Sequence, residues 1–169
     1  MRVYLLVLGE REAVAWVLDQ QRMAFPARRQ TEVQRLEPGD ELLIYTTRGC
    51  WHDPKKDQGR IIGRAYVTSP VRVLNKPVKL AGRVFTSGCD IDVRTLTPYR
   101  TGVGLAPLVD RLGAFPDKRA WGVRIRRPLL ELSAADAALV RDLLAEQEIP
   151  AAEQLSSYLQ AIRRAVTGR

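Results

Sequence analysis

Polar and aromatic residues gather at the end of one strongly patterned stretch of the chain, Glu37 to Trp51 (EPGDELLIYTTRGCW). They are Tyr45, Thr46, Thr47, Arg48 and Trp51. Tyrosine and tryptophan offer flat π-faces for stacking, threonine hydroxyls donate and accept hydrogen bonds, and arginine presents a planar fork of donors. Together these groups suit a flat, polar ligand such as a nucleobase. The alternative is that Tyr45 belongs to the core and that the others form an ordinary strand end.

A second group of candidates lies near the N-terminus. Apolar residues at helical spacing predict a buried stripe made of Val14, Val17 and Leu18. Trp16 does not lie on this stripe, because each helical residue turns by about 100°. It is therefore either a wall of the ligand site or a side chain that packs on a neighbouring loop. Arg22 and Phe25, where the helical pattern fades before Pro26, are candidates for the same wall.

Charge indicates what kind of partner the chain has. Lys and Arg number 27 against 19 Asp and Glu, which leaves a net charge of +8 at pH 7. This balance favours a polyanion as partner, and an arginine-rich surface without any ligand explains it equally well. If nucleic acid is bound, phosphate contacts are expected from Arg28, Arg29, Lys55, Lys56 and Arg60. A solvated, charged loop is the alternative for these residues.

The strand that carries the first group has a clear beginning. Pro38-Gly39-Asp40 predicts a tight turn, because proline fixes φ and glycine tolerates φ > 0. Glu41 to Thr47 then predicts a half-buried strand, rich in β-branched and aromatic residues. Further strands are predicted at Arg2–Leu8, at Arg60–Val67 with an internal Gly63 typical of a bulge or close backbone approach, in short pieces between 71 and 85, at Ile91–Leu96, and at Ala120–Ile125.

Helices are predicted to flank these strands. The first carries Glu10 and Glu12 in its first turn, where negative charge is favourable. A short helix is expected at Leu105–Leu112, and two longer ones follow Ser133 and span about Ala152–Val166. The order of strand, helix, many strands and two helices predicts an α+β fold around a small curved sheet or barrel, with helices at its ends.

Catalytic and metal-binding patterns are poor. His52 is the only histidine, and Cys50 and Cys89 do not show the spacing of zinc ligands. Asp90 and Asp92 lie on one face of a strand and could hold Mg²⁺, but such pairs usually face solvent. We therefore expect no catalytic residue, no metal and no cofactor.

Length and composition predict a packed protein of one domain, or one domain with an appendage, in 169 residues. No apolar run approaches the ~20 residues that span a bilayer, so no membrane partner is expected. Met1 to Tyr4 is interpreted as the beginning of a core strand and not of a signal peptide. With nothing that indicates export, Cys50 and Cys89 are interpreted as reduced thiols of a cytoplasmic protein.

Three segments in order resemble the EVE domain of the PUA-like superfamily, of which ASCH domains are near relatives. They are YLLVLG at Tyr4–Gly9, LEPGDELLIYTTRG at Leu36–Gly49 and GRIIGRAYVTSP at Gly59–Pro70. The resemblance implies a PUA-like mixed-sheet pseudobarrel over residues 1–130, with flanking helices. Residues 131–169 would then form a C-terminal helix pair packed on it. The resemblance also implies that a modified base of DNA or RNA enters an aromatic-lined pocket.

The chain departs from the family pattern between the first helix and the Pro38-Gly39 turn. RMAFPARRQTEVQ replaces the stretch that is common there in EVE domains. If that stretch lines the pocket, Arg22, Met23 and Phe25 stand in for it, and the ligand can differ.

Three functions follow as hypotheses. The first is a non-catalytic nucleic-acid-binding domain that reads a modified base or nucleotide in an aromatic-lined pocket, as a monomer or weak homodimer. The second is an ASCH-like RNA or DNA hydrolase, whose metal-dependent cleavage would need Asp90 or Arg48. The third is a protein–protein interaction or dimerisation module, in which Leu155, Leu159 and Ile162 would be exposed in the monomer.

Overall fold

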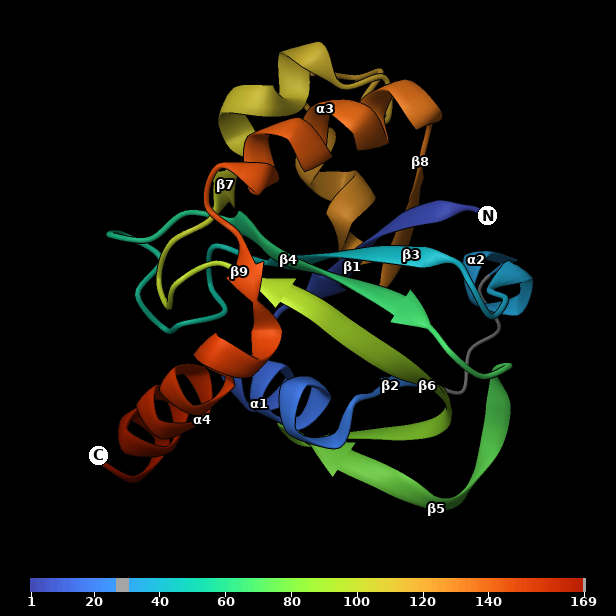
Figure 1. Cartoon of the computed structure of the whole chain (residues 1–169), viewed down its shortest axis with the longest axis vertical. Helices are drawn as coiled ribbons and strands as arrows, with labels where there is room; N and C mark the ends of the chain where they lie inside the picture. Colours follow the sequence, from blue (N-terminus) through green and yellow to red (C-terminus); the bar gives the residue numbers. More distant parts are fainter. Residues whose placement is uncertain (27–30, 169) are drawn as a thin grey trace.

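The computed structural model describes residues 1–26 and 31–168 (Figure 1). Within these residues a curled sheet holds the strands in the order β2-β6-β4-β3-β1-β8, with β5 and β9 paired to β6 and β7 paired to β4. β1 and β3 are parallel, and the other pairings are antiparallel. The strands are β1 (Val3–Leu8), β2 (Arg22–Phe25), β3 (Glu41–Thr46), β4 (Arg60–Val67), β5 (Arg72–Leu80), β6 (Arg83–Leu96), β7 (Val103–Gly104), β8 (Leu129–Leu132) and β9 (Ile149–Pro150).

Helices cover both faces of this sheet (Figure 1). They are α1 (Arg11–Gln20), α2 (Thr31–Arg35), the 3₁₀ helices η1 (Ala106–Arg111) and η2 (Trp121–Arg126), α3 (Ala134–Ala145) and α4 (Ala151–Thr167). The predicted α+β class, a small mixed sheet curled into a half-barrel with flanking helices, is confirmed. No helix in the described part of the chain is both long and apolar enough to cross a bilayer.

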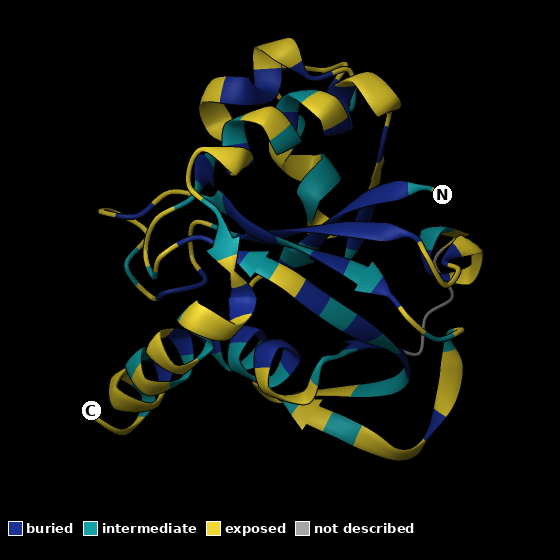
Figure 2. Cartoon of the chain, in the orientation of Figure 1, coloured by how far each residue is buried: buried dark blue, intermediate teal, exposed yellow. Residues whose placement is uncertain are grey.

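The sheet has a hydrophobic core on each face, because side chains alternate along its strands. On β3, Leu42 and Ile44 enter one core together with α1 and α4. Leu43 and Tyr45 enter the other core together with η1 and α3. Figure 2 shows this burial along the middle strands, while the outer surfaces of α3 and α4 carry the exposed residues. The central strand β3 is therefore buried on both faces.

The two C-terminal helices pack on different cores. Val140 and Leu144 of α3 enter the core shared with η1, whereas Tyr158 and Ile162 of α4 enter the core shared with α1. Figure 1 shows the helices on opposite sides of the sheet, joined across its edge by β9. They flank the sheet without packing as a pair, and the predicted domain boundary between residues 130 and 131 falls within β8.

Gly63 on β4 allows the backbones of neighbouring strands to approach closely. A Cβ atom at this position would collide with the backbone oxygen of Thr95 on β6. The pairing of β3 with β4 shifts in register just beyond Ile44, and that of β4 with β6 shifts just beyond Arg64. Such irregularities bend a strand and increase its twist. The predicted bulge or close backbone approach at Gly63 is confirmed.

The prediction that Arg22–Phe25 ends a helix is wrong, because this segment forms β2. Gln21 adopts φ 52° and ψ 47°, a left-handed conformation that ends α1 and turns the chain. β2 then pairs with the Ser87–Asp90 part of β6, which buries Met23 and Phe25. Four residues are too few to show a periodic pattern in the sequence. The structure of β2 therefore depends on its pairing with β6, which is distant in the sequence.

The prediction of a strand at Ala120–Ile125 is also wrong, because these residues overlap the 3₁₀ helix η2. Trp121 packs edge-on against Phe115, with ring centroids 6.0 Å apart. Ile125 packs against the same core. Both apolar side chains therefore pack against this core without a pairing strand.

Candidate ligand cavity

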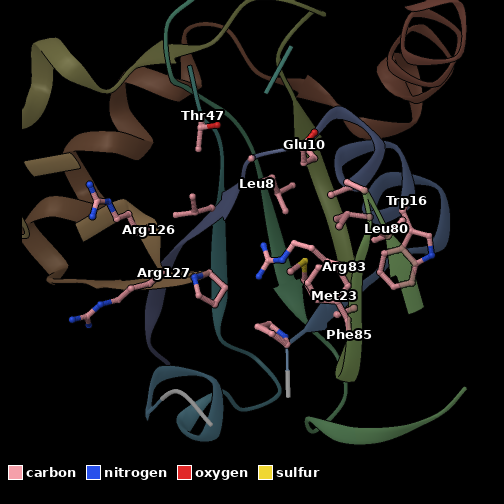
Figure 3. A pocket seen from close by; sticks show the side chains of 18 of the residues that line it. Leu8, Glu10, Trp16, Met23, Thr47, Leu80, Arg83, Phe85, Arg126 and Arg127 are labelled. Carbon is pink, nitrogen blue, oxygen red and sulfur yellow. The ribbon is translucent and has the colours of Figure 1, made fainter. Parts of the chain in front are cut away.

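A cavity of about 330 Å³ opens beside the end of β1 (Figure 3). Its walls come from the first turns of α1, from β2, from the β5–β6 hairpin and from the connection between η2 and β8. Thr47, directly after β3, also lines it. Its volume lies at the lower end of the ~300–1,000 Å³ that is usual for ligand sites, so the cavity suits one compact ring system.

The transition from β1 to α1 forms one side of the cavity. Leu8, Gly9 and Glu10 line it here. Glu10 holds the N-cap position of α1 in an extended conformation, with φ −136° and ψ 135°, and its side chain makes no capping hydrogen bond. The first N–H groups of a helix have no partner within the helix and carry partial positive charge. This side of the cavity therefore combines the positive end of the α1 dipole with the negative carboxylate of Glu10.

Trp16 supplies an aromatic wall from α1. The guanidinium of Arg22 lies over its ring, with Cζ 5.9 Å from the ring centroid. Asp90 on β6 holds Arg22 in turn, with Oδ1 3.8 Å from Nε. A cation over an indole face is attracted to it, so this contact stabilises the orientation of Trp16. On another side, Trp16 borders a more open hollow between α1 and α4.

The β5–β6 hairpin supplies the second aromatic wall. Ala81 and Gly82 have φ values of 50° and 76°, and Leu80 pairs with Arg83 across this two-residue turn. Positive φ at both turn residues matches the twist of the strands. Arg83 and Phe85, two residues apart, share one face of β6, and the guanidinium Cζ lies 5.3 Å from the Phe85 ring centroid. Leu80, Arg83 and Phe85 line the cavity.

The wall opposite the hairpin comes from the end of η2 (Figure 3). Arg126 and Arg127 lie here, and Arg127 Nη1 is 2.9 Å from Glu32 Oε1 of α2. The backbone N–H of Val7 donates to the oxygen of Pro128 at 2.9 Å, which ties this wall to β1. Positive charge therefore lies on both sides of the cavity.

Two of the predicted ligand-site residues line the cavity, namely Trp16 and Thr47. The backbone N–H of Thr47 donates to the oxygen of Leu8 at 3.0 Å, so the ends of β1 and β3 hold its position. Arg22 touches the site through Trp16. Arg48 is exposed in the turn after β3 and does not line the cavity.

The other predicted residues of the ligand site are buried. Tyr45 lies beneath Gly59 in the core shared with η1 and α3, and burial raises its pKa to about 12. Thr46 is fully buried, and its hydroxyl donates to the Arg60 oxygen at 3.4 Å. Phe25 and Trp51 belong to the core shared with α1 and α4. None of these side chains lines the cavity.

The predicted phosphate contacts are spread over several environments. Lys55 and Lys56 are exposed in the loop between β3 and β4. Arg60 is half-buried, with Nη2 3.7 Å from Oδ1 of the buried Asp57. Arg28 and Arg29 lie outside the described residues.

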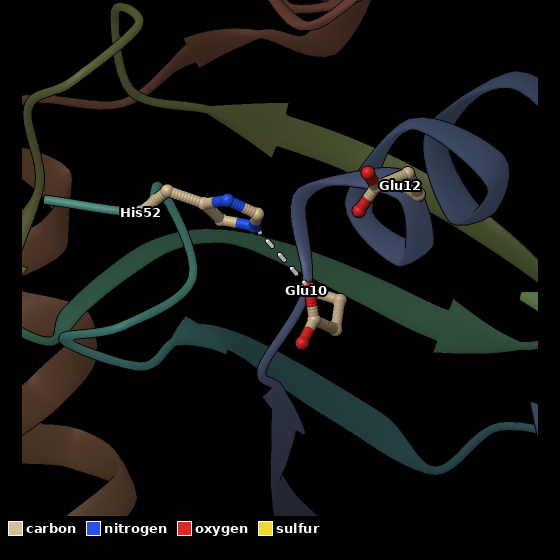
Figure 4. Close-up of side chains that lie close together, drawn as sticks. All are labelled: Glu10, Glu12 and His52. Atoms are coloured by element: carbon tan, nitrogen blue, oxygen red, sulfur yellow. Dashed lines mark ion pairs between the residues drawn. The ribbon is translucent and has the colours of Figure 1, made fainter. Parts of the chain in front are cut away.

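Metal-ligating atoms of Glu10, Glu12 and His52 lie within 4.8 Å of one another (Figure 4). His52 Nε2 is 3.5 Å from Glu10 Oε2. These donors could hold a divalent cation, but acidic residues at the start of a helix are favoured by its dipole without one. Asp90, considered as a Mg²⁺ ligand from the sequence, instead lies 3.1 Å from Arg72. We assign no metal to either group.

The two cysteines are unsuited to nucleophilic chemistry. Both are free and buried. Burial raises the pKa of Cys89 to about 12, with a smaller contribution from Asp90. Burial also raises the pKa of Cys50 far above its ordinary value, with a further contribution from Glu10. The thiolate is the reactive form of cysteine, so these side chains act as small apolar residues.

Sequence reasoning missed several cavity residues. The sequence placed Arg83 and Phe85 only within a region of short predicted strands, and not in a ligand site. Gly82 between two apolar-patterned runs was an available, though not specific, signal of a turn. For Arg126 and Arg127 the sequence showed only a local excess of positive charge, which does not by itself indicate a ligand site. What places these residues beside Trp16 is the arrangement of distant elements around β1.

Comparison with known proteins supplies the fold class. No family model and no curated protein matches the chain. Among solved structures, it is similar to human THYN1 in complex with 5-methylcytosine-containing DNA, at 14% identity and a TM-score of 0.56 over 85% of this chain and 97% of that one. It is similar to the Mmi1 YTH domain in complex with RNA, at 10% identity and a TM-score of 0.58 over 86% and 78%. It is also similar to a protein from Pseudomonas putida, at 15% identity and a TM-score of 0.57 over 83% and 98%.

These similarities place the chain in the PUA-like fold class, with structural neighbours of the EVE type. At such low identities the likeness is one of fold. The resemblance to EVE domains predicted from three ordered segments is confirmed at that level.

Proposed function

We propose that this chain is a nucleic-acid-binding domain that takes a single modified base or nucleotide into the cavity beside Trp16. The observation that carries the proposal is the pairing of two aromatic walls, Trp16 and Phe85, with arginines and a helix N-terminus around about 330 Å³. Aromatic side chains stack on flat bases, while arginine and backbone donors meet acceptors on the base edge.

Charge and structural neighbours support the same function. The chain carries a net charge of +8, which attracts a polyanion. THYN1 is a structural neighbour in complex with 5-methylcytosine-containing DNA, and the Mmi1 YTH domain is one in complex with RNA. A nucleic acid with a modified base is therefore the partner class that fits both the cavity and its surroundings.

Within this proposal the predicted residues have different roles. Trp16 stacks on the base, Thr47 offers its hydroxyl to the base edge, and Arg22 holds Trp16 through the stacked guanidinium. Tyr45, Thr46, Trp51 and Phe25 are buried in the protein and make no direct contact with the ligand. Met23 and Phe85 complete the apolar lining.

Phosphate contacts are proposed around the cavity mouth. Arg126 and Arg127 lie on one side of it, and the exposed Arg48, Lys55 and Lys56 follow β3. Arg60, Arg28 and Arg29 remain proposed contacts of the same kind. Such contacts position a strand without reading its sequence, so they explain general affinity and not the choice of base.

The test measures the affinity of short single-stranded DNA and RNA oligonucleotides by fluorescence anisotropy, each with one central base that is either modified or unmodified. We expect a modified oligonucleotide to bind more tightly than its unmodified match. Trp16→Ala should weaken that binding by about 1–3 kcal/mol, the usual loss when a base–aromatic stack is removed. Trp121→Ala is the matched control, because Trp121 packs on Phe115 in the other core.

Absence of binding to every oligonucleotide near 50 mM salt, where phosphate contacts are strongest, would refute the proposal. Equal losses of affinity in folded Trp16→Ala and Trp121→Ala protein would show that the ligand does not bind in this cavity.

A further inference from the structure

Arg83 differs from the other arginines of the cavity. Figure 3 shows its side chain reaching over the cavity, whereas the guanidinium groups of Arg126 and Arg127 point away from its centre. Arg22 and Arg127 each have an acidic partner. In the part of the chain that the structure describes, no ion pair involves Arg83. Its charge is therefore available to a ligand.

The position of Arg83 is held before any ligand binds. It is the first residue after the two-residue turn, and it pairs with Leu80 across the hairpin. Its guanidinium also stacks on Phe85, 5.3 Å from the ring centroid. A side chain that is already ordered loses less conformational entropy on binding. Arg83 is thus suited to selecting a ligand and not only to attracting one.

Arg83 brings a positive charge without an acidic partner among the described residues to this site. Arg83 and the first turn of α1, which lacks a side-chain cap, both offer donors. Glu10 also lines the cavity, and one of its two carboxylate oxygens lies 3.5 Å from His52 Nε2. The remaining polar group from the strands is the hydroxyl of Thr47. A neutral methyl group would contact the apolar walls and leave the fork of Arg83 without an acceptor.

We propose that Arg83 is the specificity-determining residue of the cavity, and that it selects a base carrying an anionic oxygen substituent, such as a carboxylate, over one carrying only a methyl group. This inference rests on the proposed function of the same site. Arginine and a carboxylate form two parallel charge-assisted hydrogen bonds. A methyl substituent accepts neither of them.

The same pair of anionic oxygens could come from a phosphate beside the base. Both sources present a planar or tetrahedral oxyanion to the guanidinium, and arginine binds either of them through its fork. The experiment distinguishes these two sources by removing the phosphate charge while the base carboxylate is kept.

The experiment compares matched oligonucleotides whose central base is cytosine, 5-methylcytosine or 5-carboxylcytosine, with affinities measured by fluorescence anisotropy. We expect the affinity for the carboxyl form to be higher than that for the methyl form by about tenfold or more. This is the order of discrimination that one good bidentate contact supplies. Arg83→Gln should reduce this ratio to about twofold or less. Arg83→Lys, which keeps the charge but not the fork, should give an intermediate ratio.

Arg126→Gln is the matched control, since it removes an equal charge from the same cavity rim. It should weaken all oligonucleotides by a similar factor and leave the carboxyl-to-methyl ratio unchanged. A further arm replaces the phosphates next to the base with neutral methylphosphonates. If the carboxyl-to-methyl affinity ratio is unchanged in the methylphosphonate oligonucleotides, the base carboxylate is the partner of Arg83. If Arg83→Gln no longer changes the affinity for any of these oligonucleotides, the phosphate is the partner of Arg83.

The outcomes separate this inference from the proposed function. Tighter binding of 5-methylcytosine than of 5-carboxylcytosine would overturn the inference and leave base reading intact. A carboxyl preference that persists in Arg83→Gln would overturn the role of Arg83. Binding of none of the oligonucleotides would overturn both.

Discussion

Two groups of aromatic residues in this protein have opposite surroundings. Trp51, Tyr99 and Tyr158 stack edge to face, with successive ring centroids 5.3 and 5.4 Å apart, and Trp51 and Tyr158 are buried. Trp16 and Phe85 instead border the cavity, and each is covered by a guanidinium at 5.9 or 5.3 Å. Rings that are enclosed by other rings stabilise the fold, whereas rings beside open space and a cation are available for a ligand.

The comparison teaches that residue type alone does not distinguish a site from a core. Trp51 and Trp16 have the same chemistry and both looked like pocket residues in the sequence. Trp51 is 7% exposed and packs on Tyr99, while Trp16 lines the cavity. Mutations in the two groups should therefore separate stability from binding.

The largest effect is expected for Trp51→Ala. Removing a buried tryptophan deletes apolar contacts and leaves a cavity, which usually costs about 3–5 kcal/mol of unfolding free energy. Urea unfolding followed by circular dichroism measures this loss. Oligonucleotide affinity, expressed per folded molecule, should stay the same. A loss of affinity in fully folded Trp51→Ala protein would contradict the division between the two groups.

Charged residues give a second comparison. Glu41 has two arginine partners, whereas Arg83 has no acidic partner within residues 1–26 and 31–168. The Glu41 side chain is 1% exposed and accepts hydrogen bonds from Arg64 at 2.9 Å and Arg141 at 2.7 Å. Glu41→Gln should lower the unfolding free energy by about 2–3 kcal/mol, less than for a fully buried pair because both arginines reach solvent. Arg83→Gln should change it by less than about 0.5 kcal/mol.

The same glutamate predicts a dependence of stability on acid. Burial by itself would raise the pKa of Glu41, but the hydrogen bonds from Arg64 and Arg141 outweigh it and lower the pKa below 4.5. A lowered folded-state pKa contributes stability above the unfolded-state pKa, and this is lost as pH falls through the folded-state pKa. Urea unfolding at a series of pH values should show this loss below about pH 4.5 in the natural protein. A Glu41→Gln curve with the same slope would contradict this assignment.

A smaller effect, on binding, is expected for Phe85→Ala. The loss of one aromatic wall should weaken oligonucleotide binding by about 1–3 kcal/mol. Unfolding free energy should change much less than in Trp51→Ala, because Phe85 is only half-buried. Anisotropy titration and thermal unfolding of the same preparation measure both quantities. A stability loss as large as that of Trp51→Ala would place Phe85 with the structural aromatic residues.

A loss of stability smaller than that of Trp51→Ala or Glu41→Gln is expected for Tyr158→Phe. The Tyr158 hydroxyl donates a buried hydrogen bond to the Thr97 oxygen at 2.8 Å, and its removal should cost about 1 kcal/mol at neutral pH. Burial raises the pKa of Tyr158 from 10.0 to about 12. The neutral hydroxyl therefore contributes stability that is complete below pH 10 and is lost as pH rises toward 12.

Urea unfolding between neutral pH and pH 12 tests this sign. The natural protein should lose stability over the alkaline range more steeply than Tyr158→Phe, so the two curves converge. Tyr45, whose pKa is also raised to about 12, is present in both proteins and cancels in the comparison. Curves that stay parallel would show that the Tyr158 hydroxyl is already solvated.

Local patterns predicted most of the fold. Val3–Leu8, Arg60–Val67 and Ala151–Thr167 form where apolar alternation or helical spacing indicated them. β2 and η2 were missed, since both are short and their structure depends on a distant partner: β6 for the former and Phe115 for the latter.

By itself, the sequence determined the strands, the main helices, the basic charge and the approximate end of β3 where Thr47 lies. Only the tertiary structure decided which aromatic residues are enclosed and which border a cavity. Alternation and helical period are properties of neighbouring residues, so they can be read along the chain. The cavity forms where Trp16, Thr47, Arg83 and Arg126 meet from segments far apart in the sequence, and only the packing of the sheet and its helices brings them together.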